Sequence, residues 1–195
     1  SSLQKRVHEL ADPRFAHSQD AMNAHRDVIL QMEGFVEEQL PLLTPIQTSW
    51  QPSDLLPDFT TGTWHEAVER LRDGAGSLSD DVLVVLVGDT VTEEALPSYQ
   101  TMTNRHAGIT DSTGDSETPW ARWTRGWTAE ENRHGELLKT YLYLSGRVDM
   151  HAVERTTQHL LRNGFNPNTL NDPYRGLIYT SFQERATRVS HGNMA

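Results

Sequence analysis

The chain has 195 residues, a formal net charge of −10 and no cysteine. This length predicts a single domain, residues 1–195, with a substantial core. The acidic balance argues against nucleic-acid binding, and the lack of cysteine excludes disulfides and thiolate metal sites. The longest apolar run, residues 82–87, is far too short to span a bilayer, so we expect a soluble protein that is not membrane-spanning.

Helical periodicity dominates the first part of the chain, and strand alternation is nearly absent. A long amphipathic helix is predicted over residues 15–40, and two prolines just beyond it fit its end. Residues 44–62 are rich in Pro, Ser and Asp and predict an irregular connector. A short helix should follow at 64–72, and the Gly-Ala-Gly sequence at 74–76 is expected to break it.

The second part of the chain also predicts helices. Ser79 precedes two aspartates and should cap a helix that carries Glu93 and is kinked by Pro97. The remaining predicted segments are a loop at 108–119, a long helix at 120–146, a helix at 150–163 stopped by glycine, turns at 166–173, and a helix from 174 onward. The fold class is therefore all-α.

The segment 127–135 places Glu131 and His134 three residues apart in the long predicted helix. Residues at i and i+3 share a helix face, so the carboxylate and the imidazole can bind one metal ion. Glu130 has no histidine at that spacing, which favours Glu131 as the ligand. An isolated pair of this kind also arises by chance on solvated helix surfaces. The ligand types suit iron, manganese or zinc equally.

Two further glutamates, Glu93 and Glu184, stand in apolar-flanked helical segments, one on each side of this pair. A desolvated carboxylate needs a charge partner or a metal. Glu94 is an alternative to Glu93, but Glu93 shares a helix face with Asp89. The order lone Glu, Glu-x-x-His, lone Glu matches part of a four-helix di-iron site, whose second Glu-x-x-His is not found after Glu184.

Four long motifs occur in the chain: GDTVTEEALPSYQ at 88–100, WTAEENRHG at 127–135, YLYLSGRVDM at 141–150 and YTSFQERATRVSHGN at 179–193. In order and spacing they strongly resemble the soluble acyl-acyl carrier protein desaturases of the plant stearoyl type. The resemblance covers most of the chain from about Trp50 onward. It implies a ferritin-like di-iron helical bundle that inserts a cis double bond into a fatty acyl chain on acyl carrier protein, in fatty acid biosynthesis.

The resemblance further implies two Fe ions, O₂, electrons from ferredoxin, and a homodimer in the bacterial cytoplasm or the plastid stroma. It assigns Glu93, Glu131, His134 and Glu184 as metal ligands. The family uses six protein ligands, so we expect the C-terminal part of the bundle to be missing from this chain and the 195 residues alone to be inactive. The alternatives are an acyl hydroxylase or oxidase on the same scaffold, and a non-catalytic or truncated ferritin-like iron-binding protein.

Four residues are expected to support the metals. Asp89 lies one helical turn before Glu93 and could accept the free ring N–H of His134, and Arg133 could pair with a carboxylate behind the site. By resemblance, Thr187 matches a hydroxyl residue near the oxygen site, and Trp50 matches a tryptophan on the electron path. Ordinary capping, surface hydrogen bonding or packing remain alternatives for these residues. His191 is expected to lie on the helix surface.

The resemblance also implies a narrow apolar tunnel for the acyl chain. The matching positions are Met102, Thr103, Arg105, His106, Pro167, Thr169, Gly176 and Leu177. Arg105 and His106 stand where the plant enzymes carry small or apolar residues, and Arg188 replaces an aromatic residue. Polar groups at the tunnel end would shorten it if they turn inward, because burying them unpaired is costly, and would leave it unchanged if they turn outward.

Overall fold

The computed structural model describes residues 13–169 and 171–194, and every regular element in these ranges is helical. The all-α prediction is therefore confirmed for the described residues. No helix in this part of the chain is both long and apolar enough to cross a membrane. The elements are α2 (Pro13–Gln31), α3 (Glu33–Gln39), η1 (Leu40–Leu42), η2 (Pro52–Asp54), α4 (Trp64–Gly76), α5 (Asp80–Glu93), α6 (Leu96–Thr103), α7 (Pro119–Ser145), α8 (Met150–Asn163) and α9 (Pro173–Met194).

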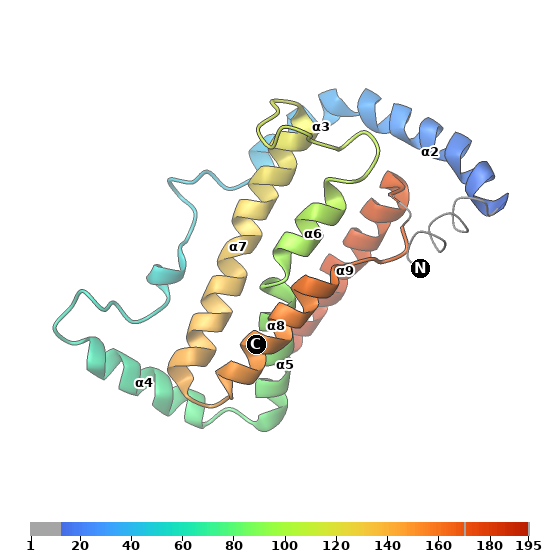
Figure 1. Cartoon of the computed structure of the whole chain (residues 1–195). Helices are drawn as coiled ribbons and strands as arrows, with labels where there is room; N and C mark the ends of the chain where they lie inside the picture. The colour runs from blue at the N-terminus through green and yellow to red at the C-terminus, as the bar shows by residue number, and fades with distance from the viewer. Residues whose placement is uncertain (1–12, 170, 195) are drawn as a thin grey trace.

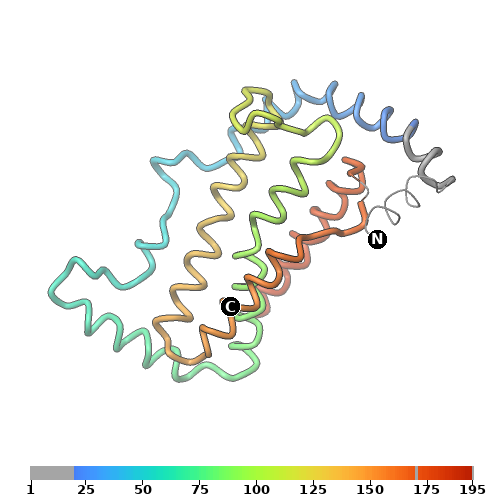
Figure 2. The backbone as a smooth tube through the Cα atoms, viewed as in Figure 1, coloured from blue at the N-terminus to red at the C-terminus, as the bar shows by residue number. Residues whose placement is uncertain are grey.

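The long helix α7 runs the length of the helical bundle (Figure 1). It packs against α3, α4, α5 and α6, while α8 packs on α5 and α9 contacts α2. The irregular connector between η1 and α4 runs along one side of α7, and the smooth trace shows it leaving and rejoining the bundle (Figure 2). The candidate metal ligands on α5 and α7 thus lie on the most extensively packed pair of helices.

A small apolar core fixes the start of α7 against α2. Ile29, Val36, Ile109 and Trp120 are buried together, and the Trp120 indole N–H donates to the backbone carbonyl of Ile29 at 2.9 Å. Gly108 has a φ of +87°, and a Cβ there would lie 2.9 Å from the Ile29 side chain. The chain turns toward α7 at this point because glycine permits both the backbone conformation and the close approach.

Three predicted helices differ from the observed ones. The helix expected over 15–40 is divided into α2 and α3 at Met32. The helix expected to stop near Arg72 continues to Gly76, because Ala75 is 1% exposed and its burial offsets the weak helix propensity of the neighbouring glycines. Pro97 does not kink a continuous helix, because α5 ends at Glu93 and Pro97 lies in the first turn of α6. Backbone N–H groups in a first turn have no partner within the helix, so the N–H that proline lacks is not missed there. The Ser79 cap, the long helix with the loop before it, and the glycine that stops the helix over 150–163 occur as predicted.

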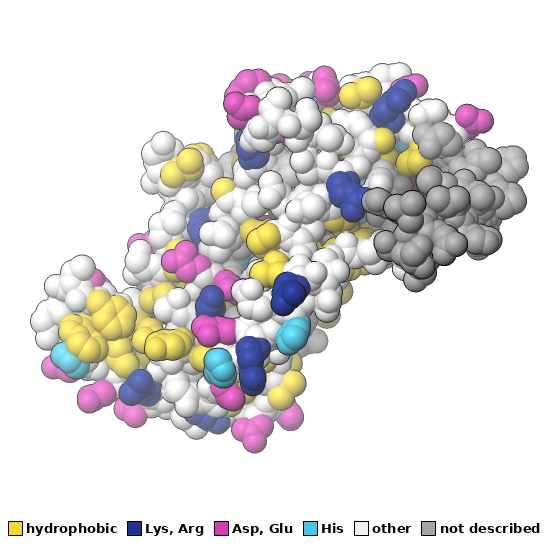
Figure 3. All heavy atoms as spheres, in the orientation of Figure 1, with side chains coloured by type: hydrophobic (Ala, Val, Ile, Leu, Met, Phe, Trp, Pro, Cys, Tyr) yellow, Lys and Arg dark blue, Asp and Glu magenta, His cyan; other side chains and the backbone are white. Residues whose placement is uncertain are grey.

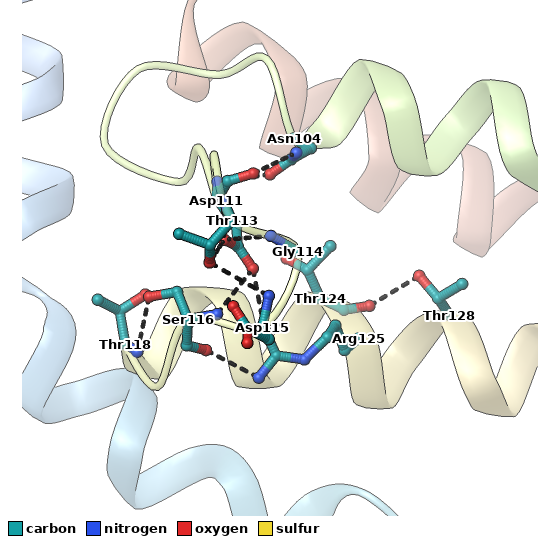
Figure 4. Close-up of polar contacts among 10 residues, drawn as sticks. All are labelled: Asn104, Asp111, Thr113, Gly114, Asp115, Ser116, Thr118, Thr124, Arg125 and Thr128. Atoms are coloured by element: carbon teal, nitrogen blue, oxygen red, sulfur yellow. Dashed lines mark hydrogen bonds and ion pairs between the residues drawn. The ribbon is translucent and has the colours of Figure 1, made fainter.

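The loop between α6 and α7 is tied down by one carboxylate (Figure 4). Asp111 accepts hydrogen bonds from the Thr113 hydroxyl at 2.7 Å and from the backbone N–H groups of Thr113, Gly114 and Ser116. Its other partner is Arg125 of α7, whose Nη1 lies 2.9 Å from Oδ2. The Thr113 hydroxyl, followed by these backbone amides, lowers the pKa of Asp111 to about 2.

We expect Asp111→Asn to destabilise the protein at neutral pH, because an amide cannot accept from every donor that the carboxylate satisfies. A depressed pKa stabilises the fold above the unfolded value near 3.8, and this contribution is lost as pH falls through about 2. The difference in free energy of unfolding between wild type and Asp111→Asn should therefore narrow as the pH falls from 3.8 to about 2. Urea unfolding as a function of pH measures it, with exposed Asp115→Asn as the control; equal wild-type and Asp111→Asn stability at neutral pH would contradict the assigned role.

Candidate metal centre

Helices α5 and α7 bring together Glu93, Glu131 and His134, whose ligand atoms all lie within 4.8 Å of one another. His134 Nδ1 is 2.9 Å from Glu131 Oε2 and 3.7 Å from Glu93 Oε2. Gly135 permits this approach, because a Cβ there would lie 3.1 Å from Glu94 Oε1 and 3.2 Å from the Glu93 carbonyl carbon. One face of α7 thus presents the i, i+3 pair directly to the end of α5.

The neighbouring glutamates have other partners. Glu94 Oε2 lies 2.9 Å from Lys139 Nζ, and Glu130 accepts a hydrogen bond from the backbone N–H of Thr44. Helix geometry explains the division, since adjacent residues point about 100° apart. The structure therefore places Glu93 and Glu131, and not the adjacent residues, beside His134.

Glu184 of α9 lines the same cavity as Glu93 and Glu131, a space of about 340 Å³ between α9 and the helices α5 to α8. It is not part of the three-residue cluster. Much of its surface is exposed, yet burial by the surrounding protein, followed by the charges of Glu131 and Glu93, raises the pKa of Glu184. Three carboxylates border one cavity, so a cation there would relieve their mutual repulsion.

In the metal-free protein, the cation among these carboxylates is His134. Its hydrogen bonds, first with Glu131 and then with Glu93, raise the pKa of His134 to about 10. A metal ion must displace that proton to reach Nδ1. Carboxylate oxygens with one imidazole nitrogen fit iron, manganese or zinc, so the donor set is compatible with the metal that the sequence implies.

Trp50 reaches the cluster from the connector. Its ring stacks on His134 with centroids 5.9 Å apart and an angle of 10° between planes. The sequence suggested that Arg133 pairs with a carboxylate behind the site, but the structure shows that it contacts Trp50 instead. Its guanidinium carbon lies 4.7 Å from the centre of the Trp50 ring, and its Nη1 donates to the Trp50 carbonyl at 2.6 Å. Arg133 thus holds Trp50 against the imidazole by a cation–π contact and a hydrogen bond.

The expected contact between Asp89 and His134 is corrected by the structure. Asp89 Oδ2 lies 3.2 Å from His191 Nε2, within ion-pair distance but without hydrogen-bond geometry. The imidazole of His134 is instead turned toward Glu131 and Glu93. His191 is exposed, as expected for the helix surface, and its ring lies beside Asp89 of α5. Thr187 lines the cavity one turn beyond Glu184.

The expected tunnel residues are distributed over more than one space. Met102 and Thr103 line the cavity beside the glutamates, called the inner cavity below. Met102 also lines a second, outer cavity of about 800 Å³, together with Arg105, Pro167 and Thr169. Leu177 packs against the Ile29 core cluster instead. Sequence reasoning missed Trp127 and Tyr99 in the inner cavity; Trp127 lies four residues before Glu131, a spacing that could have indicated it.

Arg105 and His106 turn in opposite directions. Arg105 is exposed, whereas His106 is 2% exposed, and neither of its ring nitrogens has a hydrogen-bond partner among the residues that the structure describes. Its ring occupies the space beside Gly176, where a Cβ would lie 2.2 Å from His106 Cε1. Burial lowers the pKa of His106, so the imidazole is neutral at neutral pH.

We expect His106→Leu to stabilise the protein by about 1–3 kcal/mol, because a residue of similar size replaces a buried polar ring that has no hydrogen-bond partner in the described part of the chain. Since the pKa of folded His106 is lowered, wild-type stability falls as pH drops below the ordinary value of 6.5, and the gain should be larger near pH 5 than near pH 8. Urea unfolding at both pH values measures this. Exposed His151→Leu is the control, and destabilisation by His106→Leu at both pH values would contradict the expectation.

The metal centre itself can be tested through His134. We expect one proton to be released per metal ion bound, and metal affinity to fall about tenfold per pH unit of acidification, because His134 is protonated below about pH 10 in the metal-free protein. Calorimetry in buffers of different ionisation enthalpy counts the proton. His134→Ala should abolish tight Fe²⁺ binding and keep the helicity, with exposed His159→Ala as the control; undiminished binding by His134→Ala would refute the ligand.

The described residues form helices only, and α5 and α7 bring carboxylates and an imidazole together beside a cavity. This is the arrangement found in helical carboxylate metal proteins. Residues 24–195 match the fatty acid desaturase family, and the chain therefore belongs to that family. This confirms the resemblance found in the motifs.

Several plant proteins are similar to the chain over most of its length. Chloroplastic stearoyl-acyl-carrier-protein 9-desaturase 1 of Arabidopsis thaliana is 56% identical over 87% of this chain and 43% of its own length. The chloroplastic acyl-acyl-carrier-protein desaturase of Cucumis sativus is 58% identical over the same shares. Stearoyl-acyl-carrier-protein 9-desaturase 1 of Oryza sativa subsp. indica is 54% identical over 93% and 48%. The chain spans less than half the length of these relatives.

Proposed function

We propose that the chain is part of an acyl-acyl carrier protein desaturase. The observation that supports this most directly is the cluster of Glu93, Glu131 and His134 at the edge of the inner cavity, which also has aromatic walls. Apolar cavities with a few convergent polar groups are typical of small-ligand sites. The relatives named above are desaturases of acyl chains on acyl carrier protein, which gives the proposal its substrate class.

The proposed cofactor is a pair of iron ions. Glu93, Glu131, His134 and Glu184 would be the ligands from this chain, and a second Glu-x-x-His outside the 195 residues would complete the set. Bound iron would supply the reduction of O₂: with two electrons and two protons, O₂ takes one hydrogen from each of two adjacent methylenes and leaves a double bond and two waters.

The chain's own residues would position the substrate and move protons. Tyr99, Trp127 and Tyr179 line the inner cavity and would hold an acyl chain beside the carboxylates away from water. The Thr187 hydroxyl could hold or pass a proton there. Trp50, stacked on His134, would give electrons from the reductant a short route to the ligand. Asp89 would act through α9, by its contact with His191.

The proposed partners are acyl carrier protein, ferredoxin and a second copy of the chain in a homodimer. An acidic carrier protein needs a local basic surface on a protein whose net charge is −10. Figure 3 shows basic and histidine side chains gathered over α8, where His151, Arg155, His159 and Arg162 are exposed. The relatives are named chloroplastic, which favours the plastid stroma over a bacterial cytoplasm for this proposal.

The test is turnover by the whole protein loaded with iron and supplied with acyl-acyl carrier protein, reduced ferredoxin and O₂. We expect one double bond per O₂ consumed, detected by mass spectrometry of the released acyl chain. Glu131→Gln should lower turnover by at least about a thousandfold, as loss of a metal ligand removes the reacting group. Exposed Glu136→Gln on the same helix is the control. Bound iron without any unsaturated product would instead support a non-catalytic iron-binding protein, and a hydroxylated product would support a hydroxylase.

A further inference from the structure

The inner and outer cavities are separate spaces that meet at one place. The inner cavity borders Glu93, Glu131 and Glu184. The outer cavity lies between α6 on one side and, on the other, the end of α8 with residues 164–169 and 171 that follow it. Of the described residues that line them, Met102 and Phe165 are the two that border both cavities. These two side chains, one from α6 and one from the segment after α8, therefore form the wall between the cavities.

Phe165 is held in this wall by two tyrosines of the inner cavity. It meets Tyr99 edge-on, with ring centroids 5.0 Å apart and an angle of 79°, and it lies 5.9 Å from the Tyr179 ring. Such aromatic pairs contribute about 0.5–1.5 kcal/mol beyond the apolar area that they bury. The ring is thus packed toward the metal side of the wall, and its removal would open a passage.

The backbone around Phe165 permits this placement. Gly164 ends α8 with a φ of +71°, a conformation that glycine adopts without strain, and the chain turns there. Phe165 is the first residue after that turn. Met102, on the opposite side, has an unbranched side chain that adapts to its neighbours. The wall therefore combines a rigid aromatic ring with one adaptable side chain.

We propose that Phe165, together with Met102, is the partition that sets how far an acyl chain can extend from the metal centre. This rests on the proposed function, because it requires an acyl chain in the inner cavity. A chain that fits the inner cavity ends against the Phe165 ring, and a longer one must displace the ring from Tyr99 and Tyr179 to enter the outer cavity. Phe165 is then a determinant of substrate length.

Binding of acyl chains tests the partition without turnover. Each methylene that becomes fully buried should raise affinity about fourfold, equivalent to about 0.8 kcal/mol. The probes are saturated acyl-pantetheine thioesters of increasing length, which displace a fluorescent apolar dye from the intact protein. For wild type we expect affinity to rise with length and then to level off where the chain meets Phe165.

The variants move this limit in opposite directions. Phe165→Ala should extend the rise to longer chains and tighten binding of the longest thioesters at least about tenfold. Phe165→Leu should extend it less, and it serves as the second variant if circular dichroism shows that the alanine protein has lost helicity. Phe165→Trp should move the limit to shorter chains. Phe182→Ala is the matched control, because Phe182 is 73% exposed and lines neither cavity.

The possible outcomes distinguish a failure of the Phe165 partition from a failure of the proposed function. An unchanged length limit in Phe165→Ala and Phe165→Leu, with normal wild-type binding, would overturn the partition and leave the proposed function standing. Absence of binding by wild type at every length would overturn both. An equal shift in Phe182→Ala would show general loosening of the bundle and would also reject Phe165 as the determinant.

Discussion

Negative charge between α5, α7 and α9 is the constraint on which the centre of the molecule depends. Glu93, Glu131 and Glu184 border one cavity, and the strongly raised pKa of His134 and the raised pKa of Glu184 both follow from that arrangement. Protons balance the carboxylates in the metal-free protein, and a metal ion would replace them. The same mutual repulsion would be relieved by a bound cation.

The surrounding packing brings the carboxylates together. Gly135 lets α7 approach the end of α5, and the Trp120–Ile29 contact fixes the beginning of α7. Asp111 anchors the loop that connects α6 to α7. None of these residues reaches the metal centre itself. They fix the relative positions of α5, α6 and α7, so the side chains of Glu93, Glu131 and His134 meet in the folded protein.

Local pattern predicted the helices and the i, i+3 pair, because both depend on residues a few positions apart. The Ser79 cap and the Glu131–His134 pair were readable for this reason. Contacts between segments that are distant in the sequence could not be predicted in this way. Arg133 with Trp50, and Asp89 with His191, join residues whose approach depends on how helices pack. Long-range packing likewise decided that His106 turns inward.

Helix α9 is the least constrained wall of the centre. Its packing partner among the helices is chiefly α2, and Ile178, Phe182 and Val189 remain exposed along it. Yet it carries Glu184 and Thr187 and forms one side of the inner cavity. A metal bound by Glu184 together with Glu93 and Glu131 would join α9 to α5 and α7. Metal binding and the packing of α9 would then be thermodynamically coupled: a bound metal would stabilise the packed position of α9, and packed α9 would raise the affinity for the metal.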